Sequence, residues 1–321
     1  MGAMRNRLPI SGIWGAMATS VSRLRSIRWS YGLAGFAAGL ATATCIFLLV
    51  YSASVPSSPS TDLWISPAQA AAPQPDSPAN LRDSICYIYG VYSVEKPDSL
   101  RRIRTEFSGS GFLVAPGVVA SNGHIAEPWR DDGGPQFSAR TGSSLKGSKP
   151  RLESLVAFFP GVASPVVLST RQVSPSADVA LLTFVPQGAS AKIAPLALGD
   201  VTAEPGDEVT VIGYPLGLMG MLAKAPRPVT ERLMREPDDL TVARELARLA
   251  LIRPSSTTGH LGDVVDDTLV FDASTAHGGS GGPVLNRQGK VIGITSAYLR
   301  GFSGGTLGVS VRALRPLLQH P

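Results

Sequence analysis

A single serine set among glycines is the segment of this sequence best suited to chemistry. The run Gly278-Gly279-Ser280-Gly281-Gly282-Pro283 surrounds one hydroxyl with residues that carry no side chain. Backbone N–H groups in such a loop can converge on one point while the serine projects from it. Acyl transfer needs this combination, a hydroxyl nucleophile beside donors for an oxyanion. The pattern predicts a nucleophile at Ser280, and a plain glycine-rich turn is the alternative.

A serine hydroxyl becomes a good nucleophile only when a base takes its proton. The chain has four histidines: His124, His260, His277 and His320. His320 is penultimate, and His277 precedes Ser280 too closely to reach round to it. His124 follows the strand-like run 118–123 and opens an expected short helix at 125–129. That placement gives an imidazole defined backbone support, so His124 is the predicted base.

A carboxylate that orients the imidazole would complete the set. Asp178 heads the apolar run Asp178-Val179-Ala180-Leu181-Leu182, where a buried charge needs partners. Asp272 is the competing candidate, although it can also serve the turn that follows it. The order His124, Asp178, Ser280 excludes the nucleophile elbow of α/β-hydrolases, in which the acid and the histidine follow the serine. The sequence holds no Asp or Glu after Ser280.

Composition and charge exclude several other classes of protein. Of the 321 residues, 44% are apolar and 17% charged, unlike a disordered or coiled-coil chain. Two cysteines cannot form a disulfide scaffold, no Cys/His cluster has metal-ligand spacing, and neither a metal nor another cofactor is expected. The net charge of +5 equals the five arginines of residues 1–30, and the other 291 residues balance to zero. The basic pI is therefore no indication of nucleic-acid binding.

The N-terminal part predicts a membrane anchor. Residues 31–51 are uncharged and would span about 31 Å as a helix, roughly the bilayer core. All nearby arginines precede this run, which predicts residues 1–30 in the cytoplasm and a single pass through the inner membrane. A cleaved signal peptide is the alternative.

Gly35 and Gly39 have the spacing of packed membrane helices, so a homo-oligomer is possible. Residues 52–81, rich in Ser, Pro and Ala, are interpreted as a linker.

From residue 82 to about 318 the pattern is that of one all-β domain. Short runs of β-branched and aromatic residues alternate with turns, which predicts a barrel or sandwich. The expected strands are 85–94, 111–114, 117–120, 155–159, 166–168, 179–184, 208–212, 268–271, 283–285, 291–295 and 306–311.

One stretch departs from this pattern. Residues 238–252 place Val242, Leu246 and Leu249 at helical spacing, with an aspartate able to cap the start. We therefore expect a helical insertion over about 225–253. It either packs on a barrel as a surface element or acts as a lid that contacts substrate.

These residues together resemble the trypsin-fold serine proteases, most closely the bacterial high-temperature-requirement (Do-like) group. The resemblance rests on five segments, in the same order as in that group: Gly109-Ser110-Gly111-Phe112-Leu113, Ser121-Asn122-Gly123-His124, Ala177 through Leu182, Gly213-Tyr214-Pro215-Leu216-Gly217, and Phe271 through Ile294. It implies two six-stranded antiparallel β-barrels that divide near residues 186–206. Gly279 departs from the polar residue usual before the serine. Because the sequence ends at Pro321, we expect none of the PDZ modules of that group.

The resemblance also implies roles for individual residues. His124 would be general base and then acid, Asp178 its orienting group and Ser280 the nucleophile, with the N–H groups of Gly278 and Ser280 as the oxyanion hole. The substrate backbone would pair with Thr295-Ser296-Ala297 as an added strand. The pocket wall would run from Ser274 to His277, and because it holds no acid, we expect cleavage after small or medium apolar residues.

The expected function is a membrane-anchored serine endopeptidase that cleaves proteins or peptides in the periplasm. Its partners would be those substrates and, through residues 31–51, the lipid bilayer. The alternative is an inactive homologue that binds peptides in the same cleft. Presence of all three predicted catalytic side chains and of the glycines favours the enzyme.

Overall fold

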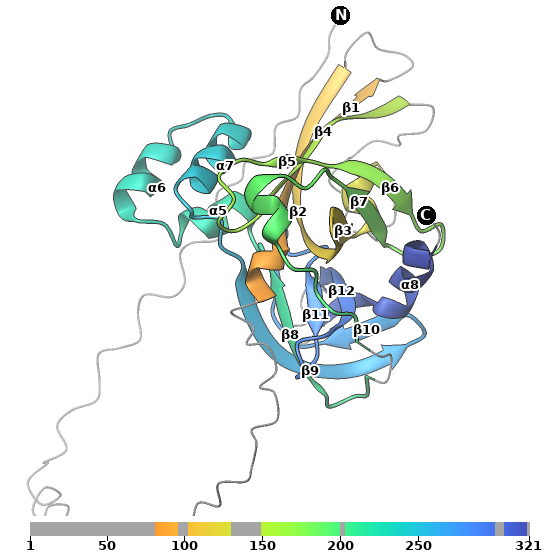
Figure 1. Cartoon of the computed structure of the whole chain (residues 1–321). Coiled ribbons are helices and arrows are strands. Elements are labelled where there is room, and N and C mark those ends of the chain that lie inside the picture. Colours follow the sequence, from red (N-terminus) through yellow and green to blue (C-terminus); the bar gives the residue numbers. More distant parts are fainter. Residues whose placement is uncertain (1–80, 96–101, 130–148, 200–202, 299–304, 320–321) are drawn as a thin grey trace, which may run out of the picture. The chain divides into compact units, whose positions relative to one another are not determined.

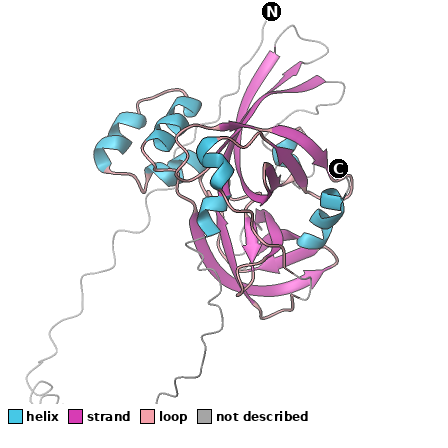
Figure 2. Cartoon of the chain, in the orientation of Figure 1, coloured by secondary structure: helices cyan, strands magenta, loops and turns pink. Residues whose placement is uncertain are grey.

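The strands form two groups, each a curled antiparallel sheet, with the helices at their margins (Figures 1 and 2). The computed structural model describes residues 81–95, 102–129, 149–199, 203–298 and 305–319. The predicted N-terminal segments, including the helix at 31–51, lie outside these residues. None of the helices within the described ranges is long and apolar enough to cross a membrane.

The first group is a seven-stranded sheet in the order β5-β4-β1-β2-β3-β7-β6. Its strands are β1 (Ile85–Glu95), β2 (Arg102–Ala115), β3 (Val118–Ser121), β4 (Lys149–Phe158), β5 (Val166–Val167), β6 (Ser169–Val173) and β7 (Ala180–Thr183). The two edge strands are separated in the chain only by buried Leu168, whose N–H donates to the carbonyl of Leu155. The sheet therefore curls back on itself. The predicted six-stranded first barrel is corrected to seven strands, because the segment 166–173 is interrupted at Leu168 and forms two strands, β5 and β6.

The second group is a closed six-stranded barrel, as predicted, in the order β10-β13-β12-β11-β8-β9. Its strands are β8 (Glu208–Gly213), β9 (Ser255–Val265), β10 (Thr268–Phe271), β11 (Pro283–Leu285), β12 (Val291–Tyr298) and β13 (Thr306–Ser310). One apolar core joins the two groups. In it the buried Tyr214 packs edge-on against Tyr87, with ring centroids 5.7 Å apart, and its hydroxyl donates to the carbonyl of Ile85.

Three helices lie between β8 and β9, grouped together at one side in Figure 1. They are α5 (Gly217–Leu222), α6 (Arg227–Leu233) and α7 (Asp239–Arg248). The predicted cap is present, since the Asp238 carboxylate accepts a hydrogen bond from the N–H of Thr241. Leu246 is fully buried in the shared core, and Glu245 pairs with Arg232 at 2.6 Å, which ties α7 to α6. The insertion therefore packs as part of the domain.

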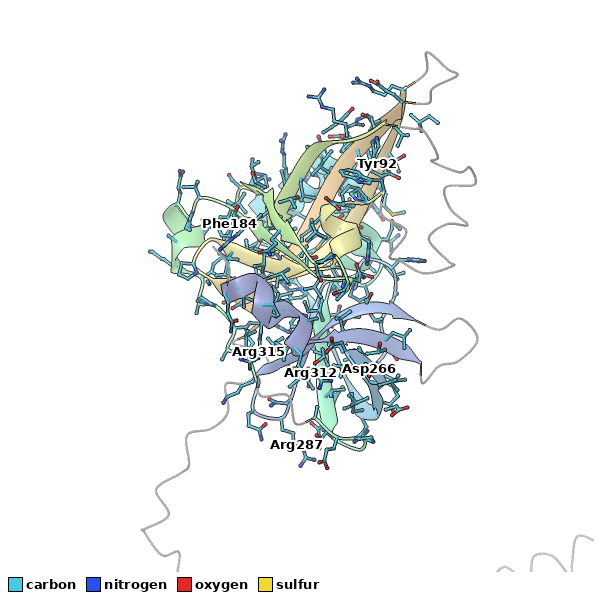
Figure 3. All side chains as sticks on the ribbon, turned by 90° about the vertical axis from the view of Figure 1, so that its right-hand side faces the viewer. Tyr92, Phe184, Asp266, Arg287, Arg312 and Arg315 are labelled. Atoms are coloured by element: carbon cyan, nitrogen blue, oxygen red, sulfur yellow. The ribbon has the colours of Figure 1, made fainter. Side chains whose placement is uncertain are left out.

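The last helix, α8 (Val311–Gln319), was not predicted from the sequence. Pro316 inside it reads as a helix breaker, but tertiary packing overrides that signal because Val311, Leu314 and Leu317 bury one face of the helix. Figure 3 shows Arg312 beside Asp266, whose backbone carbonyl accepts its hydrogen bond. These contacts fix α8 on the second barrel.

Two strands, β6 and β9, were also missed. The first half of β9 is Ser255-Ser256-Thr257-Thr258-Gly259, which lacks the apolar residues on which strand prediction depends. Its pairing with β8, from Glu208 opposite His260 to Gly213 opposite Ser255, makes it a strand. Helix α3 (Gly123–Ala126) begins before the expected short helix and ends within it.

We expect Leu246→Ala to lower the free energy of unfolding by about 2–5 kcal/mol, because it opens a cavity in the core. Urea denaturation measures this change. Arg244→Ala, on the exposed face of the same helix, should shift it by about 0.5 kcal/mol or less. Equal effects of the two substitutions would mean that α7 is a loosely attached element.

Candidate active site

His124 is placed by the turn between β3 and α3. The strand ends at Ser121, Asn122 stays extended, and the helix begins at Gly123. The Asn122 side chain is fully buried and its Nδ2 donates to the backbone carbonyl of Asp178, 2.8 Å away. His124 itself is only 8% exposed. The turn therefore fixes the imidazole and holds the chain carrying Asp178 beside it.

Asp178 directly faces His124 across this turn. Its Oδ2 lies 2.8 Å from His124 Nδ1, and its Oδ1 accepts from the His124 backbone N–H at 3.0 Å. The Ser296 hydroxyl donates to the same Oδ2 at 2.6 Å. With Nδ1 engaged by the carboxylate, proton transfer with a substrate would have to use Nε2 of His124.

The pKa of Asp178 reflects this environment. Burial alone raises it, but the hydrogen bond and charge of His124 and the Ser296 hydrogen bond outweigh burial and hold the pKa of the carboxyl below its ordinary value. The group therefore stays ionised at neutral pH, as an orienting carboxylate must.

Ser280 sits in a loop whose glycines are required sterically. Gly278 has φ +89°, and a Cβ there would lie 2.5 Å from the carbonyl oxygen of Tyr214. Gly281 has φ +88°, and a Cβ there would lie 2.0 Å from the carbonyl oxygen of Ser110. The loop thus lies against both sheets at once, in a conformation open only to glycine.

The Ser280 hydroxyl points toward β12, where it donates to the backbone carbonyl of Ser296 at 2.9 Å. Ser296 therefore contacts both Ser280, through its carbonyl, and Asp178, through its hydroxyl. Two of the three predicted catalytic residues, Asp178 and Ser280, thus contact Ser296, and the third, His124, contacts Asp178.

The two N–H groups predicted as oxyanion donors have no competing acceptor. Among the described residues, neither the Gly278 nor the Ser280 amide donates to a carbonyl or side chain. The loop is held by other bonds, from Gly279 N–H to Ala276 and from Gly282 N–H to Gly279. Both amides therefore stay the predicted oxyanion donors.

The other predicted site residues lie around the serine loop. Ser274 and His277 are exposed, and their carbonyls accept from Thr257 Oγ1 and from Leu216 N–H. Thr295 is buried and exchanges backbone hydrogen bonds with Gly281 and Gly282. Ala297 follows Ser296 on β12, where its backbone pairs with Leu307 of β13.

The competing carboxylate, Asp272, lies with another histidine. Its Oδ1 accepts from the backbone N–H of His260, with N and O 2.5 Å apart, in the second barrel. The structure thus pairs Asp178, and not Asp272, with His124. No cluster of His, Cys, Asp and Glu in the described part of the chain could hold a metal ion.

Sequence reasoning gave no role to Ser110, which is fully buried. Its hydroxyl donates to the carbonyl of Gly278 at 2.7 Å and accepts from the N–H of Tyr214 at 2.9 Å. Ser110 therefore joins the first sheet to the serine loop and to the end of β8. The sequence feature that could have indicated this role is the position of Ser110 between two glycines, in the motif Gly109-Ser110-Gly111.

Comparison with known families matches residues 109–294 to the trypsin-like peptidase domain, and this match covers more than half of the chain. The chain belongs to that family. The matched region includes His124, Asp178 and Ser280.

Curated relatives agree with this assignment at low identity. Serine protease PepD of Mycobacterium tuberculosis is 27% identical over 198 residues, 60% of this chain and 34% of that protein. A probable periplasmic serine endoprotease, DegP-like, of Chlamydia pneumoniae is 26% identical over 217 residues, 67% of this chain and 33% of that protein. The chain thus spans about a third of the length of these relatives.

Among solved structures, a variant of the HtrA-type protease AlgW with a decapeptide superposes with a TM-score of 0.51. Its sequence identity to this chain is 14%, and the match covers 75% of this chain and 65% of that one. At this identity the likeness supports the fold.

We expect acid to remove the stabilisation that Asp178 provides. Because its folded-state pKa is lowered, the contribution is complete above the unfolded value of about 3.9 and is lost as the pH falls through the lower folded value. Urea unfolding of the wild type and of Asp178→Asn between pH 2 and 7 should show a difference that narrows toward pH 2. A difference independent of pH would contradict the ionised state of the group.

We expect Gly281→Ala to disrupt the serine loop, because a Cβ there would collide with the Ser110 carbonyl. Gly161→Ala is the matched control, since Gly161 also has positive φ (+70°) but has nothing within 4 Å of its Cβ position. The control should lower the free energy of unfolding, measured with urea, by only about 1–2 kcal/mol, the strain of one left-handed residue. A cost for Gly281→Ala no larger than that of the control would show that the loop can move away.

Proposed function

We propose that the chain is a serine endopeptidase in which His124, Asp178 and Ser280 act together. The observation that carries the proposal is the arrangement around Ser296, which holds the Asp178 carboxylate with its hydroxyl and the Ser280 hydroxyl with its carbonyl. The direct contact between His124 Nδ1 and Asp178 supplies the oriented base. Membership of the trypsin-like peptidase family supports the same chemistry.

In the proposed mechanism the Ser280 hydroxyl turns from Ser296 toward His124. Nε2 of His124 takes the hydroxyl proton as the oxygen attacks the carbonyl carbon of the scissile peptide bond. Asp178 stabilises the resulting imidazolium, and the amides of Gly278 and Ser280 hold the oxyanion. Collapse of the intermediate breaks the C–N bond, and His124 returns the proton to the departing amine. Water, activated by the same imidazole, then hydrolyses the acyl-enzyme.

The substrate backbone is proposed to bind along the edge of β12. Strand β11 begins at Pro283 and pairs with β12 only as far as Ile294. Beyond it, Ala297 and Tyr298 pair on one side with β13, Ser296 lies at an irregularity of that pairing, and no strand of the described chain pairs with their other side. An extended peptide could add there as a further strand, with its scissile carbonyl beside Ser280.

The location of the activity is proposed from the sequence alone. An uncharged run at 31–51 after a basic segment favours a membrane anchor with the protease domain in the periplasm. Proteins or peptides of that compartment would then be the substrates.

We expect Ser280→Ala to abolish labelling by a fluorophosphonate probe and to lower kcat on casein by about 10⁴- to 10⁶-fold. Ser164→Ala, at an exposed serine in the connection between β4 and β5, should label and cleave like the wild type. A wild type that neither labels nor cleaves would contradict the proposed activity and favour an inactive homologue.

A further inference from the structure

The turn between β8 and α5 holds an apolar residue in an unfavourable state. Leu216 has φ +63° and ψ +8°, the left-handed region that non-glycine residues avoid for steric reasons. Its side chain is nevertheless 62% exposed, so packing within the chain does not offset the strain. Strained residues that persist without packing gains are concentrated at sites of binding and catalysis.

This turn lies directly against the serine loop. The Leu216 N–H donates to the carbonyl of His277 at 2.6 Å, and Gly217 N lies 2.9 Å from the Cβ position of Gly278. Leu216 is therefore next to the proposed oxyanion donor at Gly278. One turn further along α5, Met219 is also exposed, at 57%.

The turn and β12 contact different parts of the serine loop. Strand β12 bonds to residues 280–282, whereas Leu216 and Tyr214 contact residues 277–278. If the part of the substrate before the scissile bond lies along β12, the part after the bond leaves past Leu216. Exposed Leu216 and Met219 would then meet the first residues of the leaving segment.

We propose that Leu216 and Met219 form a specificity surface for the substrate segment that follows the scissile bond. This segment carries an apolar side chain directly after the bond. The inference rests on the proposed endopeptidase function, and it assigns to α5 the selection of substrate on the leaving-group side.

Leu216→Asn tests the proposal, because asparagine tolerates the left-handed conformation and lacks the apolar side chain. Two sets of substrates share the same residues before the bond. One set consists of peptide p-nitroanilides, which have no residues after the bond, and the other of internally quenched peptides with Leu or Ser directly after it.

We expect Leu216→Asn to lower kcat/KM about tenfold on the Leu peptide and to leave kcat/KM on the p-nitroanilide unchanged. The wild type should prefer Leu over Ser directly after the bond, and Leu216→Asn should lose this preference. Met234→Gln, at an equally exposed methionine (61%) just after α6, should behave like the wild type on every substrate.

The outcomes separate this inference from the proposed function. A wild type that neither labels with fluorophosphonate nor cleaves any substrate would overturn the proposed function. A wild type that labels and cleaves, with the same Leu preference in Leu216→Asn, would overturn the inference alone. An equal loss on p-nitroanilides and peptides would also overturn it, because it would show a purely structural role for Leu216.

Discussion

The carboxylate of Asp178 is the group on which the organisation of the site depends. A buried charge is costly unless it is paired and hydrogen-bonded, and here its partners come from two regions far apart in the chain. His124 approaches from the first sheet and Ser296 from the second barrel. Since the Ser296 carbonyl also accepts a hydrogen bond from the Ser280 hydroxyl, this one carboxylate connects the segments that carry His124 and Ser280.

Close contact between the two sheets imposes the second constraint. Ser110 bonds to both Gly278 and Tyr214, and the backbone of the serine loop approaches so near that a single Cβ at Gly281 would meet the Ser110 carbonyl. The glycines of the loop are thus needed for the close packing of the two sheets. The same closeness brings the turn at Leu216 against the loop and connects the helical insertion to the site.

Much of this arrangement could be predicted from residue types and their order. The closed second barrel, the capped helix α7 and the pairing of His124 with Asp178 agree with expectation. Prediction failed where the local signal was weak or opposed, as in the hydroxyl-rich start of β9 and in α8, which contains Pro316. In both cases pairing or burial against distant residues overrode local preference.

The sequence by itself determined the chemical groups, a hydroxyl among glycines, an imidazole and a carboxylate, because residue type and chain order are local information. Only the tertiary structure decided which groups meet. It joined Asp178 to His124 and placed Asp272 at His260, and it gave Ser296 two partners at once. These contacts depend on the register and packing of strands far apart in the chain, which no local pattern specifies.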